Sequence, residues 1–125
     1  MILFKHGESQ EKQFWQLSPK TQMIVVDAAH FIKSKFGVDC IVTSVIREDG
    51  IHAAGRACDI RSFNLKDEEI AKLDHYLNDK YPYGKINPRT GQPYKTCYYH
   101  KSDKSDEPEY HFHLQNKFDG SIHPK

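Results

Sequence analysis

The sequence predicts one α+β domain spanning residues 1–125, in which a small antiparallel β-sheet carries two main helices on one face. Two long stretches have apolar residues three and four positions apart, as amphipathic helices do. Several shorter stretches are rich in β-branched and aromatic residues and are separated by turns, as strands are. A chain of 125 residues, 38% of them hydrophobic, is long enough to bury one core without disulfide bonds.

The first predicted helix begins after Ser18 and ends at Gly37. Ser18 suits the N-cap, Pro19 suits the first helical position, and Gly37 suits the C-terminal stop. The second predicted helix lies within residues 64–82, where acidic residues come early, apolar residues recur at helical spacing, and Pro82 ends the pattern. We expect both helices to bury an apolar face.

The predicted strands are short and separated by polar turns. The ranges are 38–47, 57–63, 94–101 and 109–116, with turns at 48–50 and 102–108 and a loop rich in Gly, Pro and Asn at 83–93. Cys40, Cys58 and Cys97 form no C-x-x-C pair and have apolar or aromatic neighbours, so we expect reduced, buried thiols.

Charge and hydropathy argue against two classes of partner. The formal net charge is +1 with both signs mixed along the chain, so electrostatics do not favour nucleic acid. No run approaches the roughly 18 apolar residues of a membrane span. The first residues lack the apolar run and cleavage site of a signal peptide. We expect a monomer made in the cytoplasm and not exported by a signal of its own.

The last predicted strand has one polar and one apolar face. The strand period of two places Glu109, His111, His113 and Gln115 together, opposite Tyr110, Phe112 and Leu114. Because the aromatic face would supply the burial that a strand needs, the two imidazoles and the carboxylate on the other face indicate a binding or catalytic role.

A second polar pair stands in "IHAAGRACDI". Glycine and alanine between His52 and Asp59 let the loop histidine fold back beside the aspartate, either in a hydrogen bond or as a metal ligand pair. Catalytic zinc sites use three protein ligands and leave a fourth position open for water. His52, Asp59 and His113 would make such a set. His111, about 7 Å from His113 along the strand, is a candidate general base.

The stretch from His52 to Ile60 resembles the H-x-x-G-x-A-x-D signature of a superfamily of zinc proteins. This superfamily unites lysostaphin-type peptidases, D-Ala-D-Ala metallopeptidases and the Hedgehog signalling domain, and His111-Phe-His113 matches the H-x-H motif of its late strand. The resemblance covers about residues 42–115. It implies that His52, Asp59 and His113 bind Zn²⁺ on the face opposite the helices and that His111 is the catalytic base or a transition-state stabiliser.

The resemblance bears on two further residues. Many members place an arginine shortly before the first ligand, where Arg47 could hold a substrate carboxylate, although a surface ion pair is an equal alternative. Members with this signature often carry E-x-x-H, whereas the residue three before His113 is Tyr110. The base is therefore His111 or Glu109, and either imidazole of the H-x-H motif could reach the metal.

These observations predict a zinc metallopeptidase that hydrolyses a peptide bond in peptidoglycan stem peptides, of the D,D- or L,D-peptidase type. Without a signal peptide or a wall-binding module, it would be a phage or prophage lysis enzyme that reaches the periplasmic cell wall after release. The alternative is a zinc-stabilised binding or structural domain on the same fold. His111 separates the two, because a structural site needs no base beside its metal.

Overall fold

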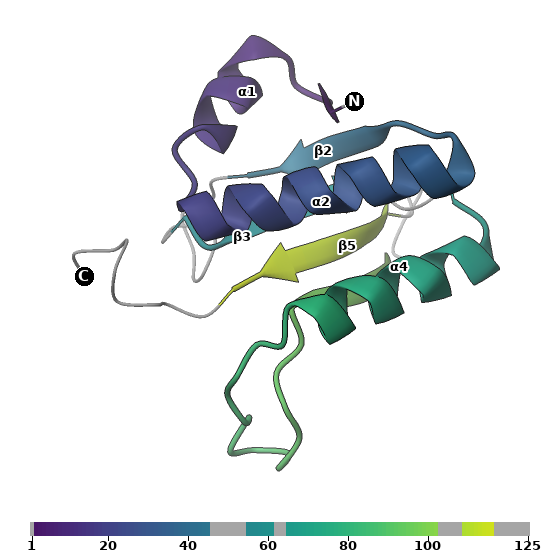
Figure 1. The fold of residues 1–125 in the computed structure, drawn as a ribbon. Coiled ribbons are helices and arrows are strands. Elements are labelled where there is room, and N and C mark those ends of the chain that lie inside the picture. The colour runs from purple at the N-terminus through teal and green to yellow at the C-terminus, as the bar shows by residue number, and fades with distance from the viewer. Residues whose placement is uncertain (1, 46–54, 62–64, 103–108, 117–125) are drawn as a thin grey trace.

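The computed structural model describes residues 2–45, 55–61, 65–102 and 109–116, with backbone alone at 100–102 and 109–110. The described chain is a small α+β protein built on a five-stranded mixed sheet in the order β1-β2-β3-β5-β4 (Figure 1). The strands are β1 (Ile2–Phe4), β2 (Cys40–Ser44), β3 (Ala57–Arg61), β4 (Cys97–Ser102) and β5 (Glu109–Gln115). The helices of the described ranges are α1 (Glu8–Phe14), α2 (Pro19–Phe36) and α4 (Asp67–Lys80).

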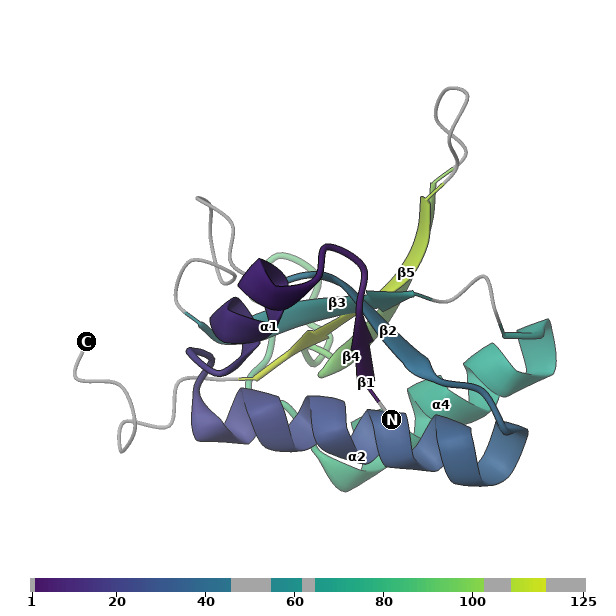
Figure 2. The same ribbon diagram turned by 90° about the horizontal axis from the view of Figure 1, so that it is seen from above.

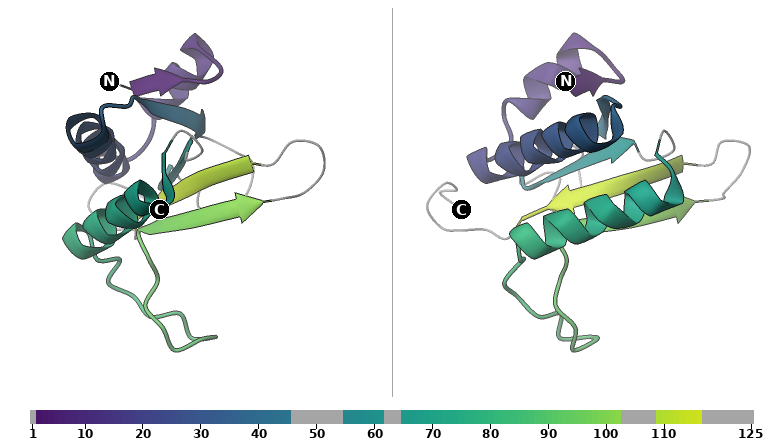
Figure 3. Two further views of the ribbon diagram at one scale, coloured as in Figure 1. Left: turned by 90° about the vertical axis from the view of Figure 1, so that its right-hand side faces the viewer. Right: turned by 45° about the vertical axis from the view of Figure 1, so that its right-hand side comes forward.

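The two long helices lie on one face of the sheet, as predicted (Figure 2). Both further views show α2 and α4 together on the same side of the strands (Figure 3). Alternate residues of the central strands, including Cys58, Ile60, Phe112 and Leu114, are completely buried in the core that these helices cover. The face that carries the intervening residues is therefore the one available for a site.

The predicted antiparallel sheet is correct for most of its pairs and wrong at one edge. β2 with β3, β3 with β5, and β4 with β5 all pair antiparallel, but β1 pairs parallel with β2. A parallel neighbour needs a crossover connection, which α1 and α2 provide. β1 has only three residues and α1 only seven, and segments this short show too few repeats of a periodic pattern to be read from sequence.

The ends of α2 confirm the capping prediction. The Ser18 hydroxyl accepts a hydrogen bond from the Thr21 backbone N–H at 3.2 Å, and Pro19 occupies the first helical position. Gly37 adopts a left-handed conformation with φ of 75° and donates its N–H to the Lys33 carbonyl. These local signals determine where the helix begins and ends, because each one satisfies backbone groups that the helix itself leaves unpaired.

The three cysteines are free and buried, as predicted. Burial raises the pKa of the Cys40 thiol to about 12 and that of Cys58 well above its ordinary value. Burial also raises the pKa of Cys97. Because the thiolate is the reactive form, these side chains act as small apolar packing groups.

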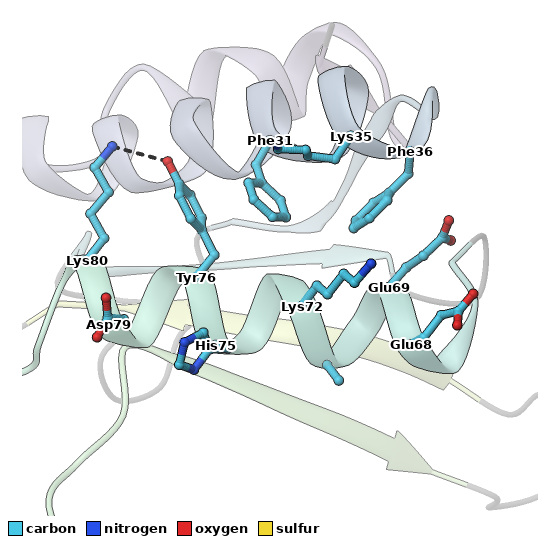
Figure 4. A pocket seen from close by; sticks show the side chains of 11 residues that line it. Phe31, Lys35, Phe36, Glu68, Glu69, Lys72, His75, Tyr76, Asp79 and Lys80 are labelled. Carbon is cyan, nitrogen blue, oxygen red and sulfur yellow. Dashed lines mark hydrogen bonds between the residues drawn. The ribbon is translucent and has the colours of Figure 1, made fainter.

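A partly buried carboxylate joins the two long helices. Asp27 on α2 accepts hydrogen bonds from the Tyr76 and Tyr81 hydroxyls at 2.8 and 2.5 Å, and its Oδ2 lies 2.7 Å from Lys80 Nζ. Tyr76 and Lys80 reach from α4 toward α2 and share a hydrogen bond (Figure 4). Burial acts to raise the pKa of Asp27, but the hydrogen bonds from Lys80, Tyr81 and Tyr76 outweigh it and lower that pKa.

Asp27→Asn should lower the free energy of unfolding by about 1–3 kcal/mol at neutral pH, because the two tyrosines and Lys80 lose an ionised partner. A depressed pKa in the folded state means that this stabilisation is fully present above the unfolded pKa, near 3.8, and is lost as pH falls through the folded pKa. The difference between wild type and variant should therefore shrink below about pH 4. Urea unfolding at pH 7 and at pH 3 measures it.

The control for this prediction is Asp79→Asn, which changes an exposed aspartate on α4 in the same way. It should alter stability by less than about 0.5 kcal/mol at both pH values. An Asp27→Asn effect that stays constant from pH 7 to pH 3 would show that the ionised form of Asp27 contributes nothing specific.

Candidate metal centre

Three neighbouring strands, β3, β5 and β4, place polar residues opposite one another on one face of the sheet. Asp59 on β3 is the direct cross-strand partner of His113 on β5, and His113 in turn pairs with Tyr98 on β4. Two residues farther along β3, Arg61 pairs with His111. Because alternate residues of β3 and β5 enter the core under the helices, these residues lie on the face away from α2 and α4.

The carboxylate of Asp59 lies between the two imidazoles. Its Oδ1 is 3.0 Å from His113 Nδ1, and its Oδ2 is 3.9 Å from His111 Nε2. The exposed fractions of the side chains are 5% for Asp59, 14% for His113 and 25% for His111. Two of the three predicted ligands are thus in contact, and the predicted base stands beside them in the more open position.

This pair of donors fits zinc. Imidazole nitrogen and carboxylate oxygen are usual zinc ligands, and two ligands about 2.0–2.1 Å from a tetrahedral ion lie roughly 3.3 Å apart. The 3.0 Å between His113 Nδ1 and Asp59 Oδ1 is close to that spacing. Asp59 is also buried, and a buried carboxylate requires a compensating positive charge. The chemistry of the two side chains therefore suits a bound cation.

Gly55 explains part of the signature around Asp59. Its φ of 73° is a left-handed conformation that favours glycine. Its carbonyl accepts hydrogen bonds from the Ser18 N–H at 2.9 Å and from the Thr21 hydroxyl at 3.3 Å. The start of α2 thus holds the chain two residues before β3 begins. This anchor helps to set the position at which Asp59 faces His113.

Gln115 is a site residue to which the sequence pattern assigned no role. Its Oε1 is 3.0 Å from His113 Nε2, and its Nε2 donates to the Lys95 carbonyl at 2.8 Å. The strand period had placed Gln115 on the polar face, but a hydrogen bond to a carbonyl twenty residues away depends on strand pairing. Tyr98, the cross-strand partner of His113 on β4, has its ring 6.3 Å from that of His113.

Three of the predicted site residues lie wholly or partly outside the residues that the structure describes. His52 and Arg47 fall in the undescribed range 46–54, and of Glu109 only the backbone is described, paired with Ser102. Within the described ranges no group of three or more His, Cys, Asp or Glu side chains is arranged to hold a metal ion. His52 as third ligand, Arg47 as carboxylate holder and Glu109 as alternative base remain predictions.

A separate groove lies on the helix side of the molecule. It has a volume of about 1000 Å³ and lies between the C-terminal half of α2 and α4 (Figure 4). Phe31, Phe36 and Tyr76 form its aromatic wall, and charged side chains of both signs line its rim. Since α2 and α4 cover the face opposite Asp59 and His113, this groove is not part of the candidate metal centre.

Comparison of the chain with protein-family models, with curated proteins and with solved structures found no match. In the described ranges no helix is long and apolar enough to cross a membrane. The motif residues and the geometry of the site are therefore the basis of the function proposed below.

Proposed function

We propose that this chain is a zinc-dependent peptidase that cleaves a peptide bond in peptidoglycan stem peptides, with a fold of the Hedgehog and D-Ala-D-Ala metallopeptidase type. The observation that carries the proposal is the contact of Asp59 with His113 at 3.0 Å, with His111 beside the same carboxylate. These are the residues that the H-x-x-G-x-A-x-D and H-x-H motifs select. We further propose that it acts in phage or prophage lysis, on the periplasmic cell wall.

Each side chain then has a distinct task. Asp59 and His113 would hold the ion, with His52 as the third ligand. Zinc bound there supplies a Lewis acid that polarises the scissile carbonyl and lowers the pKa of water to about 7. His111 would take the proton from the attacking water and return it to the leaving amine. The second oxygen of Asp59 lies 3.9 Å from His111 Nε2, so the proposed base stands beside the proposed ligand.

Substrate binding would use arginine side chains. Arg47 would pair with a carboxylate of the stem peptide, since a guanidinium binds a carboxylate through two parallel hydrogen bonds. Arg61 is the cross-strand partner of His111, two residue pairs along the strands from the Asp59–His113 pair. An anionic substrate group close to His111 would therefore have Arg61 as a neighbour.

Purified protein should bind about one zinc ion per chain, and a chelator should lower its melting temperature, because ion binding to the folded state stabilises it. Metal analysis after dialysis and thermal unfolding with and without chelator measure both effects. Absence of stoichiometric metal, together with a melting temperature that neither chelator nor added zinc changes, would eliminate the site.

Activity is tested separately with muropeptides. The zinc-loaded protein should release products whose masses identify the bond that is cut, and the chelated protein should release none. Zinc binding at full stoichiometry without any product would favour the alternative function, a zinc-stabilised binding or structural domain.

A further inference from the structure

The amide of Gln115 can face His113 in only one way. The Lys95 carbonyl accepts hydrogen bonds and cannot donate them, so the Gln115 atom 2.8 Å from it must be the amide nitrogen. The amide oxygen then faces His113 Nε2 at 3.0 Å. Gln115 is 8% exposed, so water does not readily replace either contact. Gln115 therefore presents an acceptor to His113.

An acceptor at Nε2 determines how the imidazole carries its proton. Nε2 must bear the hydrogen, which leaves Nδ1 as the nitrogen with the free electron pair in the neutral ring. That electron pair points at the carboxylate of Asp59 from 3.0 Å. Two acceptors at this distance repel each other unless a positive charge lies between them, either a second proton or a metal ion. The neutral ring is thus arranged for a cation at Nδ1.

The carbonyl that orients Gln115 is itself held in place. The Lys95 N–H donates to the Tyr98 hydroxyl at 2.9 Å. Asn78 of α4 accepts hydrogen bonds from the N–H groups of Thr96 and Cys97, both at 2.9 Å. The Gln115 N–H also donates to the Thr96 carbonyl at 2.8 Å. Hydrogen bonds therefore hold the segment before β4 to both α4 and β5. The Gln115 amide cannot reverse its orientation without losing its hydrogen bond to the Lys95 carbonyl.

We propose that Gln115 is the positioning residue of the metal centre: it holds the proton of His113 on Nε2 so that Nδ1 faces the ion. The inference rests on the proposed zinc site and adds to it the residue that prepares the ligand. It also gives Gln115 a second effect. A neutral His113 that donated its Nδ1 proton to Asp59 would set its bare Nε2 against the Gln115 oxygen, so Gln115 disfavours that neutral tautomer.

The test uses Gln115→Leu, which removes the acceptor, and Gln115→Glu, which keeps an oxygen at Nε2. Gln115→Leu should weaken zinc binding by about 10–100-fold, the usual effect of losing an outer partner of a metal-bound histidine. Gln115→Glu should stay within about tenfold of wild type. Gln92→Leu, at an exposed position in the 82–95 loop, is the matched control and should bind zinc as wild type does. Competition with a chelating dye measures the affinities.

Nitrogen-15 spectra of the zinc-loaded wild type give a readout that activity does not. They should show a proton on Nε2 of His113 and none on Nδ1. A proton on Nδ1, or equal zinc affinity in wild type and Gln115→Leu, overturns the positioning role. The wild-type spectrum decides the question even if Gln115→Leu does not fold. A wild type that binds no zinc is a different failure, because it overturns the proposed function and with it this inference.

Discussion

His113→Ala should lose zinc binding and peptide hydrolysis together. Removing one of three ligands leaves two protein donors, and such a set holds the ion poorly. The substitution should also destabilise the metal-free protein by about 1–3 kcal/mol, because the buried residue Asp59 loses the imidazole that lies 3.0 Å from its Oδ1. Zinc content after dialysis, product release from muropeptides and urea unfolding measure the three effects.

His75→Ala is the matched control for this variant, since His75 is an exposed histidine on α4. It should retain zinc, activity and stability, because α4 covers the face of the sheet opposite the site. If His113→Ala retained stoichiometric zinc while His111→Ala lost it, His111 would be the ligand and His113 the candidate base.

Local chemistry explains why most of the fold could be predicted from sequence. Ser18, Pro19 and Gly37 act within a few residues of the helix ends that they define, so their meaning does not depend on distant contacts. The alternation of β5 is equally local, and Phe112 and Leu114 are completely buried as it requires. β1 is different, since three residues become a strand only because Cys40–Val42 lies alongside them.

The site required information that no local pattern contains. The period of two predicted that His111, His113 and Gln115 share a face, but not which residue of β3 would oppose each of them. Asp59 meets His113 across 54 positions of sequence because β3 and β5 pair in this register. A register shifted by one residue would have placed Cys58 or Ile60 there. The resemblance, and not the strand alternation, predicted that Asp59 and His113 lie together.

The hydrogen bond from Gln115 to the Lys95 carbonyl also could not be predicted from a local pattern. The polar face made Gln115 a candidate for contact with His113, two residues away. The orientation of its amide depends on the Lys95 carbonyl, which reaches Gln115 only because β4 pairs with β5 and Asn78 fastens the preceding segment. A positioning residue of this kind becomes visible only when three separate segments are placed together.

His111→Ala should keep stoichiometric zinc and lose most of the hydrolytic rate. Its Nε2 lies 3.9 Å from Asp59 Oδ2, farther than His113 Nδ1 lies from Oδ1, and its side chain is the more exposed of the two imidazoles. That position suits a group that exchanges protons with water and substrate, and a positioned general base typically contributes about 10²–10⁴-fold in rate.

Glu109→Gln, measured beside His111→Ala, separates the two candidate bases. Because glutamine keeps the size of glutamate but cannot accept the proton, the variant should retain both zinc and rate if His111 is the base. An inactive Glu109→Gln with zinc intact, together with an active His111→Ala, would assign the base to the carboxylate. Loss of zinc in His111→Ala would instead make His111 a ligand. Zinc that both variants retain, with no activity in the wild type, would leave a metal-stabilised domain in which the H-x-H motif has no catalytic role.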